Sequence, residues 1–571
     1  MPMSRKLAVL LLAAAALAAY WSGLRSPFVW DDDVAITTNQ SIHQIADSLN
    51  PPIETPVSGR PVANLSFALN YAFGELDPVG YHVVNLAVLV ASALLLFGLV
   101  RRTLARPLKA ATESRLTAIS LVPALLWVLH PLLSETVYYT TQRTESLMGM
   151  FYLLTLYAAI RARAKKRGGK WTALAVLACA AGMATKESMV TAPIAVVLYD
   201  LIFEFHSPRE AWKARRGLYL GLALTWLELA AIIYKWPRST VGVASVGPLT
   251  YLYNQAQMIA RYLWLTVWPH ALVVDYGLPR QLQFTDVVVP GALVVALLAL
   301  TIVALMRWPR IGFLGAMFFL TLAPTSSLIP IASEVGAERR MYLPLAALSV
   351  LLTSVVPAFR RTRSDSPPKG GHYVPIALLA LVTIALAART AYRSREFESP
   401  LVLWQTSVER WPQGRSRFAL GTQLMDAGRH QEAEAQLRLA TADYPDAKAG
   451  LGTVLLLQGK MDEGIGVLDA FVQENPSLPN RMPARVLLAQ AHRAVAEREL
   501  TSRNAPAAER AARQSIALDP TNADAHNLLG AALASQGNLR AAIPEFQAAV
   551  RINPKHEVAL KNLAQAVAMA R

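Results

Sequence analysis

Residues 83–100 read VVNLAVLVASALLLFGLV and contain no charged side chain. A run of about 18 apolar residues is long enough for a helix across a bilayer. Similar runs recur up to residue 389, and a chain with 54% hydrophobic and 16% charged residues is too apolar for a soluble protein. The sequence therefore predicts an all-α polytopic helix bundle at 1–390 with about 11 spans, at 7–22, 83–100, 116–130, 146–160, 172–184, 189–205, 217–234, 288–306, 311–331, 341–357 and 374–389.

The net charge of +16 does not indicate nucleic-acid binding, because the basic residues concentrate in short loops between the apolar runs. Loops 101–115, 161–170, 209–216, 307–310 and 360–369 are basic, which predicts that they face the cytoplasm. This orientation requires 235–287 to stay outside, with 251–268 as an interfacial or re-entrant helix. The N-terminus would then lie inside and the C-terminal part outside. The run 7–22 also resembles a signal peptide, so whether it is retained stays open.

The part of the chain after residue 414 is a repeat. Its first copy carries Gly421, Ala433, Leu437, Ala440 and Pro445, and the same offsets recur later at Gly530, Ala542, Phe546, Ala549 and Pro554. Small residues at these offsets, closed by a proline, are typical of tetratricopeptide repeats. We therefore expect a linker at 391–413 and an α-solenoid at 414–571. Its concave groove would bind an acceptor protein or an assembly partner. The alternative is a purely structural stalk.

Charged side chains on the predicted outer face are few and lie near the ends of apolar runs. They include Asp31, Asp32, Asp33, Arg60, Glu135, Arg143, Glu145, Lys186, Glu187, Glu334, Glu338, Arg339 and Arg340. If the short loops that carry them converge, they form one polar site with both signs of charge at the membrane surface. Sugar transfer from a polyprenyl phosphate to a hydroxyl needs such a set. A carboxylate takes the proton from the hydroxyl, and cations stabilise the leaving phosphate.

Within this scheme, Asp31 or Asp32 is the predicted base, and Arg143, Lys186, Arg339 and Arg340 are the predicted phosphate ligands. Simpler roles remain open for several of these residues. The acidic cluster is also compatible with a solvated loop, and His130 before Pro131 with a helix-end cap. Lys186 and Glu187 are compatible with a neighbouring ion pair, and Arg339 and Arg340 with interfacial anchors. A single cysteine, Cys179, excludes an intrachain disulfide.

An ordered set of motifs resembles the transmembrane and tetratricopeptide-repeat O-mannosyltransferases. The set comprises Phe28-Val29-Trp30-Asp31-Asp32 with Ala35, Ile36 and Asn39; Arg60-Pro61; Tyr81-His82-Val83-Val84-Asn85; His130-Pro131 with Glu135; Arg143 and Glu145 within 143–147; Lys186-Glu187; and Glu338-Arg339-Arg340 within 337–344. These motifs, followed by the repeats, cover nearly the whole chain. His82, His130, Glu135, Glu145, Glu187, Glu338 and Arg60 thereby join the candidate site residues.

The resemblance implies a GT-C fold, a lipid-phosphate sugar donor, inversion at the anomeric carbon and Ser/Thr hydroxyl acceptors. Asp31 or Asp32 matches the family's acidic pair, whereas Asp33 is an additional acid, which leaves the identity of the base open. Transferases of this class with monophosphate donors generally work without a bound metal. A divalent cation on Asp31–Asp33 is the alternative.

The short repeat array and the Ala- and Arg-rich composition favour a bacterial inner-membrane enzyme with its catalytic loops and repeats in the periplasm. Its donor would be an undecaprenyl- or decaprenyl-phosphate sugar, and its acceptor a protein hydroxyl. Two other hypotheses stay open: a transferase with a glycan or lipid acceptor, and a non-enzymatic scaffold for envelope-polysaccharide or pilus assembly. The donor sugar, the acceptor and the oligomeric state do not follow from the residues.

Overall fold

The computed structural model describes residues 3–570 except 106, 109–110, 164–167, 239–241, 243–245, 328, 362–372 and 475–480. The described chain is helical and divides into two compact units, Met1–Trp411 and Pro412–Arg571. Parts of the basic loops 101–115, 161–170 and 360–369 lie outside the described residues. The two units are described separately below.

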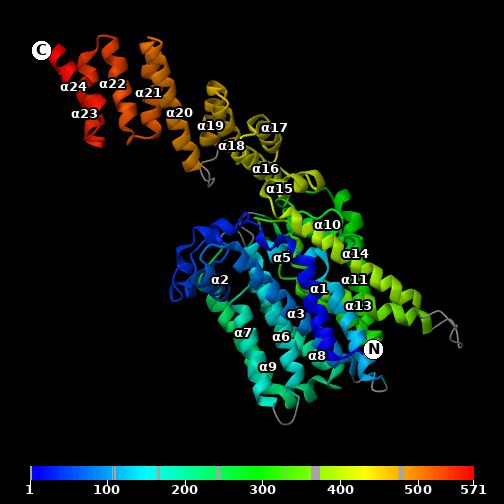
Figure 1. Ribbon diagram of the computed structural model, residues 1–571. Helices are drawn as coiled ribbons and strands as arrows, with labels where there is room; N and C mark the ends of the chain where they lie inside the picture. The colour runs from blue at the N-terminus through cyan, green and yellow to red at the C-terminus, as the bar shows by residue number, and fades with distance from the viewer. Residues whose placement is uncertain are drawn as a thin grey trace. The chain divides into compact units, whose positions relative to one another are not determined.

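The first unit is a bundle of long helices with short helical turns between them (Figure 1). Its α-helices are α1 (Arg5–Tyr20), α2 (Pro61–Gly74), α3 (Pro78–Ala105), α4 (Glu113–Val128), α5 (Glu135–Tyr138), α6 (Arg143–Arg161), α7 (Gly168–Met183), α8 (Ala192–Phe203), α9 (Pro208–Lys235), α10 (Pro248–Val267), α11 (Phe284–Arg307), α12 (Pro309–Leu322), α13 (Tyr342–Arg361), α14 (Tyr373–Glu396) and α15 (Pro400–Arg410). Each of the 11 predicted spans overlaps one of these helices.

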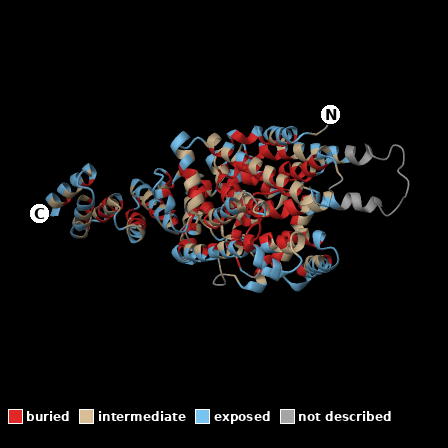
Figure 2. Ribbon diagram, turned by 90° about the horizontal axis from the view of Figure 1, so that it is seen from below, coloured by how far each residue is buried: buried red, intermediate tan, exposed pale blue. Residues whose placement is uncertain are grey.

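Three helices within the described residues, α3, α9 and α11, are long and apolar enough to cross a membrane. A fourth span results if α4 and the segment Pro131–Tyr138, bent by 56° from it, count as one. The count of 11 spans therefore stays a prediction. Only 11% of the most apolar window of α11 is buried inside the protein. Contact with lipid explains why this helix exposes so many apolar side chains. Figure 2 shows the contrast between the buried bundle interior and the exposed outer faces.

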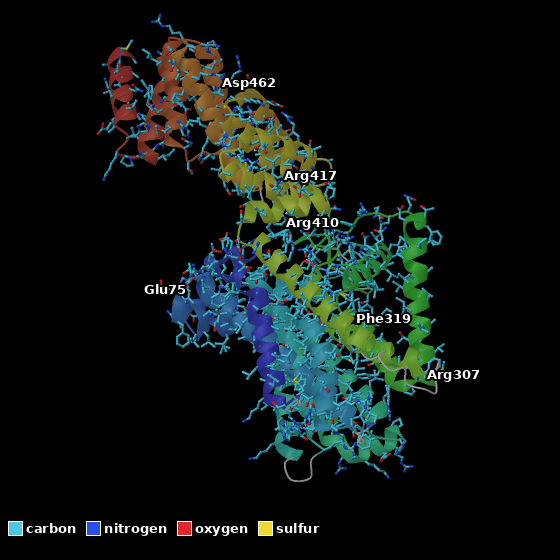
Figure 3. All side chains as sticks on the ribbon, turned by 45° about the vertical axis from the view of Figure 1, so that its right-hand side comes forward. Glu75, Arg307, Phe319, Arg410, Arg417 and Asp462 are labelled. Atoms are coloured by element: carbon cyan, nitrogen blue, oxygen red, sulfur yellow. The ribbon has the colours of Figure 1, made fainter. Side chains whose placement is uncertain are left out.

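The two ends of the bundle carry different charge networks. At one end, Glu113 at the start of α4 pairs with Arg5 of α1 and Arg101 of α3, and Arg163 pairs with Glu204. At the other end lie α2, α5 and the loops with the predicted site residues (Figure 1). Arg307, at the C-terminal end of α11, lies far from Arg410 at the end of α15 (Figure 3). The bundle thus separates the basic loops from the candidate site.

The segment expected to be a linker, 391–413, is largely helical. It contains the last turns of α14 and all of α15, and the first unit ends only at Trp411. Ser399 caps α15 by accepting a hydrogen bond from the backbone N–H of Val402, and Pro400 occupies its first turn. These local signals stop α14 and start a separate helix.

The second unit is a stack of helix pairs built from α16 (Gly414–Asp426), α17 (His430–Ala440), α18 (Ala447–Leu457), α19 (Met461–Glu474), α20 (Arg481–Thr501), α21 (Ala505–Leu518), α22 (Ala523–Ser535), α23 (Leu539–Ile552) and α24 (Glu557–Ala570). A Cβ on Gly421 would lie 2.6 Å from Leu437 Cγ, and one on Gly530 would lie 2.6 Å from Phe546 Cε1. The helices of these two pairs, α16–α17 and α22–α23, therefore cross so closely that a Cβ at the glycine would force a neighbouring side chain to shift, which explains the repeated pattern.

Candidate active site

Asp32 joins the first two outer loops. Its side chain is fully buried and accepts four hydrogen bonds. Oδ2 accepts from the N–H of Val29 (3.0 Å) and Thr140 (3.1 Å), and Oδ1 accepts from the N–H and Oγ1 of Thr141, both at 2.6 Å. Burial raises the pKa of Asp32 to about 7, although these donors lower it. With both oxygens engaged away from solvent, Asp32 orients the loops and is not placed to contact an acceptor hydroxyl.

Asp31, next to it, is half-buried and forms a hydrogen bond with the hydroxyl of Tyr139. The preceding residue, Trp30, has a φ of 50°, a left-handed conformation that is rare for a bulky side chain. A π-helical turn, η2 (Asp33–Thr37), follows, and such turns frequently occur at functional sites. Asp33 is exposed and bonded to Thr37 Oγ1. Of the three carboxylates, Asp31 is therefore the one suited to act as a base.

Arg339, in the short helix η8 (Glu338–Met341), lies between two carboxylates. Its guanidinium pairs with Glu135 and Glu334, and its backbone N–H donates to Glu135 Oε2 at 3.0 Å. The Arg339 side chain remains 12% exposed, and its guanidinium lies 5.9 Å from the centroid of the Tyr139 ring. Tyr139 therefore interacts with both the cation of Arg339 and the carboxylate of Asp31.

A second cluster of charged residues lies around η7 (Glu187–Thr191). Lys186 Nζ donates to Glu145 Oε2 at 2.6 Å, and Glu187 pairs with Arg60 and Arg238, each at 3.3 Å. Partial burial raises the pKa of Glu187, but the two guanidinium groups outweigh this and hold it at about 2.

The charged cluster around Arg339 and the one around η7 interact electrostatically. Burial lowers the pKa of Lys186; Glu145 opposes this shift, whereas Arg60 and Arg339 add to it. Arg60 and Arg339 are therefore close enough to Lys186 to repel it, and the carboxylate of Glu145 lies beside Lys186.

The other predicted phosphate ligands are committed to protein contacts. Arg143 is fully buried, and its guanidinium donates to Asn85 Oδ1 (2.6 Å), Asn70 Oδ1 (2.6 Å), Ser66 O (3.0 Å) and Tyr81 O (2.9 Å). Arg340 is buried and donates to Thr325 O (3.1 Å), Val335 O (3.3 Å) and Glu334 (3.0 Å). Contacts of this kind hold helices together and leave little capacity for a phosphate. Of the predicted set, Arg339 and Lys186 remain.

The ring nitrogens of both candidate histidines lie within hydrogen-bonding distance of backbone atoms in two different segments. His82 is buried, with Nδ1 3.1 Å from Leu24 O and Nε2 3.2 Å from Tyr138 O. His130 Nδ1 accepts from the Leu132 N–H at 3.2 Å, which caps the turn Pro131–Leu133, and Nε2 lies 3.1 Å from Thr266 O. The helix-end cap considered for His130 is thus present.

Glu338 is buried behind this region. Its Oε1 accepts from the Val273 N–H (2.5 Å) and the Tyr276 hydroxyl (3.3 Å), and Oε2 lies 3.9 Å from Arg393. Burial raises the pKa of Glu338 to about 8. Like Asp32, it is placed to organise loops.

Two residues of the site were not predicted from the sequence, Tyr139 and Arg238. Arg238 follows the predicted span 217–234 on the outer side, so the topology carried a usable signal for it. Tyr139 had no signal beyond its place in the second loop. Among the described residues, no group of three or more His, Cys, Asp or Glu side chains is placed to hold a metal ion. The alternative of a divalent cation on Asp31–Asp33 stays a prediction.

Family models match both parts of the chain. Residues 61–236 match the dolichyl-phosphate-mannose-protein mannosyltransferase family, and residues 418–479 and 485–557 match the tetratricopeptide repeat.

Curated relatives agree with these matches. Protein O-mannosyl-transferase TMTC4 of Mus musculus is 25% identical over 473 residues, which cover 71% of this chain and 62% of that protein. The tmtc2 protein of Xenopus laevis is 28% identical over 312 residues, 48% of this chain and 35% of that protein. This chain spans 62% and 47% of the first two relatives, the mouse proteins TMTC4 and TMTC3. The family resemblance seen in the motifs is confirmed.

Solved structures give more distant likenesses. ArnT from Cupriavidus metallidurans bound to undecaprenyl phosphate is 15% identical, with 82% of this chain and 81% of that chain covered at a TM-score of 0.36. The tetratricopeptide-repeat protein YrrB is 20% identical over 36% of this chain and 95% of that chain, with a TM-score of 0.23.

Proposed function

We propose that this chain, which resembles the protein O-mannosyltransferases over most of its length, is a membrane glycosyltransferase. It would transfer a sugar from a polyprenyl phosphate to a Ser or Thr hydroxyl of a protein. One observation carries the proposal: the half-buried carboxylate of Asp31 touches Tyr139, and the same ring is flanked by the cation of Arg339. A base and a cation for the leaving group thus lie within one small region.

The chemistry is a single displacement. Asp31 removes the proton from the acceptor hydroxyl as its oxygen attacks the anomeric carbon. The new glycosidic bond forms while the bond to the phosphate oxygen breaks, and the electron pair leaves with the polyprenyl phosphate. Attack from the face opposite the phosphate inverts the anomeric configuration. The proton ends on Asp31 and returns to solvent.

The cations act on the leaving group. Arg339 and Lys186 are mostly buried but remain 12% and 11% exposed. In such a site, a guanidinium or ammonium group stabilises developing phosphate charge more strongly than in water. Their carboxylate partners, Glu135 and Glu145, hold the two cations in place before the donor arrives. Arg60 and Arg238 add positive charge nearby.

The proposal extends to place and partners. The enzyme would lie in a bacterial inner membrane, with Asp31 and the repeats in the periplasm and an undecaprenyl or decaprenyl donor. The repeat groove would bind the acceptor protein or an assembly partner. If the acceptor is instead a glycan or lipid, removing the repeats should leave transfer in vitro intact.

The test is donor-dependent glycosylation by the full chain in lipid nanodiscs, with polyprenyl-phosphate sugars as donors and mass spectrometry of acceptor peptides. Asp31→Asn should slow transfer by about 100-fold or more, and the exposed neighbour variant Asp33→Asn should retain it. Transfer by a well-folded Asp31→Asn variant at the wild-type rate would rule out the assignment. No binding of any polyprenyl-phosphate sugar would favour the scaffold hypothesis.

A further inference from the structure

The segment from Thr390 to Trp411 packs against the loops of the candidate site. Thr390 Oγ1 donates to Leu129 O at 2.7 Å, just before the second outer loop. Ser394 Oγ lies 2.8 Å from the Tyr138 hydroxyl, and the rings of Phe397 and Tyr138 are 5.4 Å apart. The end of α14 thus supports the residue that precedes Tyr139.

Helix α15, in the same segment, is fixed by polar contacts to residues 272–276. The Val274 N–H donates to Ser407 Oγ at 3.4 Å, and Arg410 donates to Leu272 O at 2.9 Å and pairs with Glu396 at 2.7 Å. Trp411 Nε1 donates to Tyr276 O at 3.2 Å. Arg410 is labelled in Figure 3 at the end of this helix. These contacts give α15 a defined position on the first unit.

Trp404 of α15 reaches the first outer loop. It is 5% exposed, and its ring lies 4.6 Å from that of Trp30, between centroids. Trp30 is the residue with a left-handed backbone, and Asp31 follows it directly. A bulky residue keeps such a conformation only when its surroundings impose it. Because Trp30 and Asp31 share a peptide bond, a change in the Trp30 backbone turns the Asp31 carboxylate.

We propose that Trp404 is a positioning residue for the transfer reaction: its ring holds Trp30 in the left-handed conformation that aims Asp31 at Tyr139. The inference rests on the proposed function only for its kinetic consequence. The segment after the last predicted span thereby becomes part of the catalytic unit.

The kinetic test uses the full-length protein in nanodiscs. Trp404→Ala should lower kcat by about 10- to 100-fold, the size of effect expected when a reacting group is displaced by about 1 Å. The donor KM should change by less than about threefold, because the cations keep their partners. Trp404→Phe, which retains an aromatic ring, should recover most of kcat.

Trp411→Ala is the matched control. It removes an equally large ring next to α15, but Trp411 contacts Tyr276 and Arg261 instead of Trp30. Because the contacts of Ser407 and Arg410 to residues 272–274 still hold α15, it should leave kcat within about threefold of wild type. Equal losses in Trp404→Ala and Trp411→Ala, or a Trp404→Ala variant with wild-type kcat, would overturn the proposal.

A second measurement is independent of activity. Asp31→Cys provides a thiol in a chain whose one native cysteine, Cys179, is buried. Labelling of this thiol by a membrane-impermeant maleimide should change severalfold when Trp404→Ala is added and stay constant with Trp411→Ala. Asp47→Cys, exposed in the same loop, should be unaffected by either change.

The two readouts separate the two proposals. Unchanged labelling of the thiol at position 31 in the Trp404→Ala background refutes the positioning role. Altered labelling, together with no transfer from any polyprenyl donor in wild type, supports the positioning role and refutes the proposed function.

Discussion

Asp31→Asn and Asp32→Asn should have opposite consequences, although the two carboxylates are adjacent. Asp31 is half-buried beside Tyr139, whereas Asp32 is buried and accepts four hydrogen bonds. We expect Asp31→Asn to remove transfer with little effect on stability. Asp32→Asn should destabilise the first unit, and any loss of activity should follow from that.

The cost of Asp32→Asn follows from its donors. An asparagine has one acceptor oxygen, so its amide group must face either Val29 and Thr140 or Thr141. In the cheaper orientation only the Thr141 N–H loses its acceptor, at about 1–3 kcal/mol, because the Thr141 hydroxyl can rotate to accept. The two remaining bonds lose their charge assistance, about 1 kcal/mol each. The total is about 3–5 kcal/mol, partly offset by removal of a buried charge.

The assay compares both variants with wild type and with Asp33→Asn in nanodiscs. Thermal unfolding followed by size-exclusion chromatography gives the stability, and transfer is measured per folded protein. Loss of a general base should slow Asp31→Asn by about 10²- to 10⁴-fold at unchanged melting temperature. An Asp31→Asn variant that stays active, or an Asp32→Asn variant that melts like wild type but is inactive, would exclude these separate roles for the two carboxylates.

The remaining predictions concern three other features. Arg339→Ala leaves Glu135 buried without its partner and should destabilise the protein by about 3–5 kcal/mol. Adding Glu135→Gln should restore much of the melting temperature but should not restore transfer. Restored transfer in the double variant would contradict a phosphate-binding role for Arg339. The pKa of Glu338 is about 8 in the folded protein, against an ordinary value of 4.5. The stability that protonation of Glu338 contributes is therefore fully present below about pH 4.5 and is lost as the pH rises through about 8. From about pH 5 to 8, wild type should therefore lose stability relative to Glu338→Gln in thermal melts, and parallel curves would argue against the buried acid. In the second unit, Gly530→Ala places a Cβ 2.6 Å from Phe546 and should cost about 1–3 kcal/mol in denaturant titrations. The control Gly466→Ala, in an exposed helical position with nothing within 4 Å, should gain about 0.5–1 kcal/mol, and equal effects would exclude a packing role for Gly530.

Sequence periodicity predicted the helices well because burial and helix crossing impose regular constraints. The glycines at 421 and 530 mark helix crossings, and an apolar helix lies at each predicted span. The roles of Asp31 and Asp32 were not separable from sequence, because a tight turn buries one and leaves the next partly open. Arg143 and Arg339 look equivalent in the motifs. They differ only because Asn70, Asn85 and the carbonyls of distant residues surround the first.

The contact between Trp404 and Trp30 also had no local signal, because about 370 residues separate the two rings in the chain and only tertiary packing brings them together. The same holds for Tyr139, whose importance depends on its interactions with both Asp31 and Arg339. Residues that act through long-range contacts therefore required the structure.

The decisive measurement is a structure of the full chain with a bound polyprenyl-phosphate sugar. We expect the phosphate in contact with Arg339 or Lys186 and the Asp31 carboxylate facing the anomeric carbon from the opposite side. A phosphate bound far from both cations, or an Asp31 turned away from the sugar, would contradict this expectation.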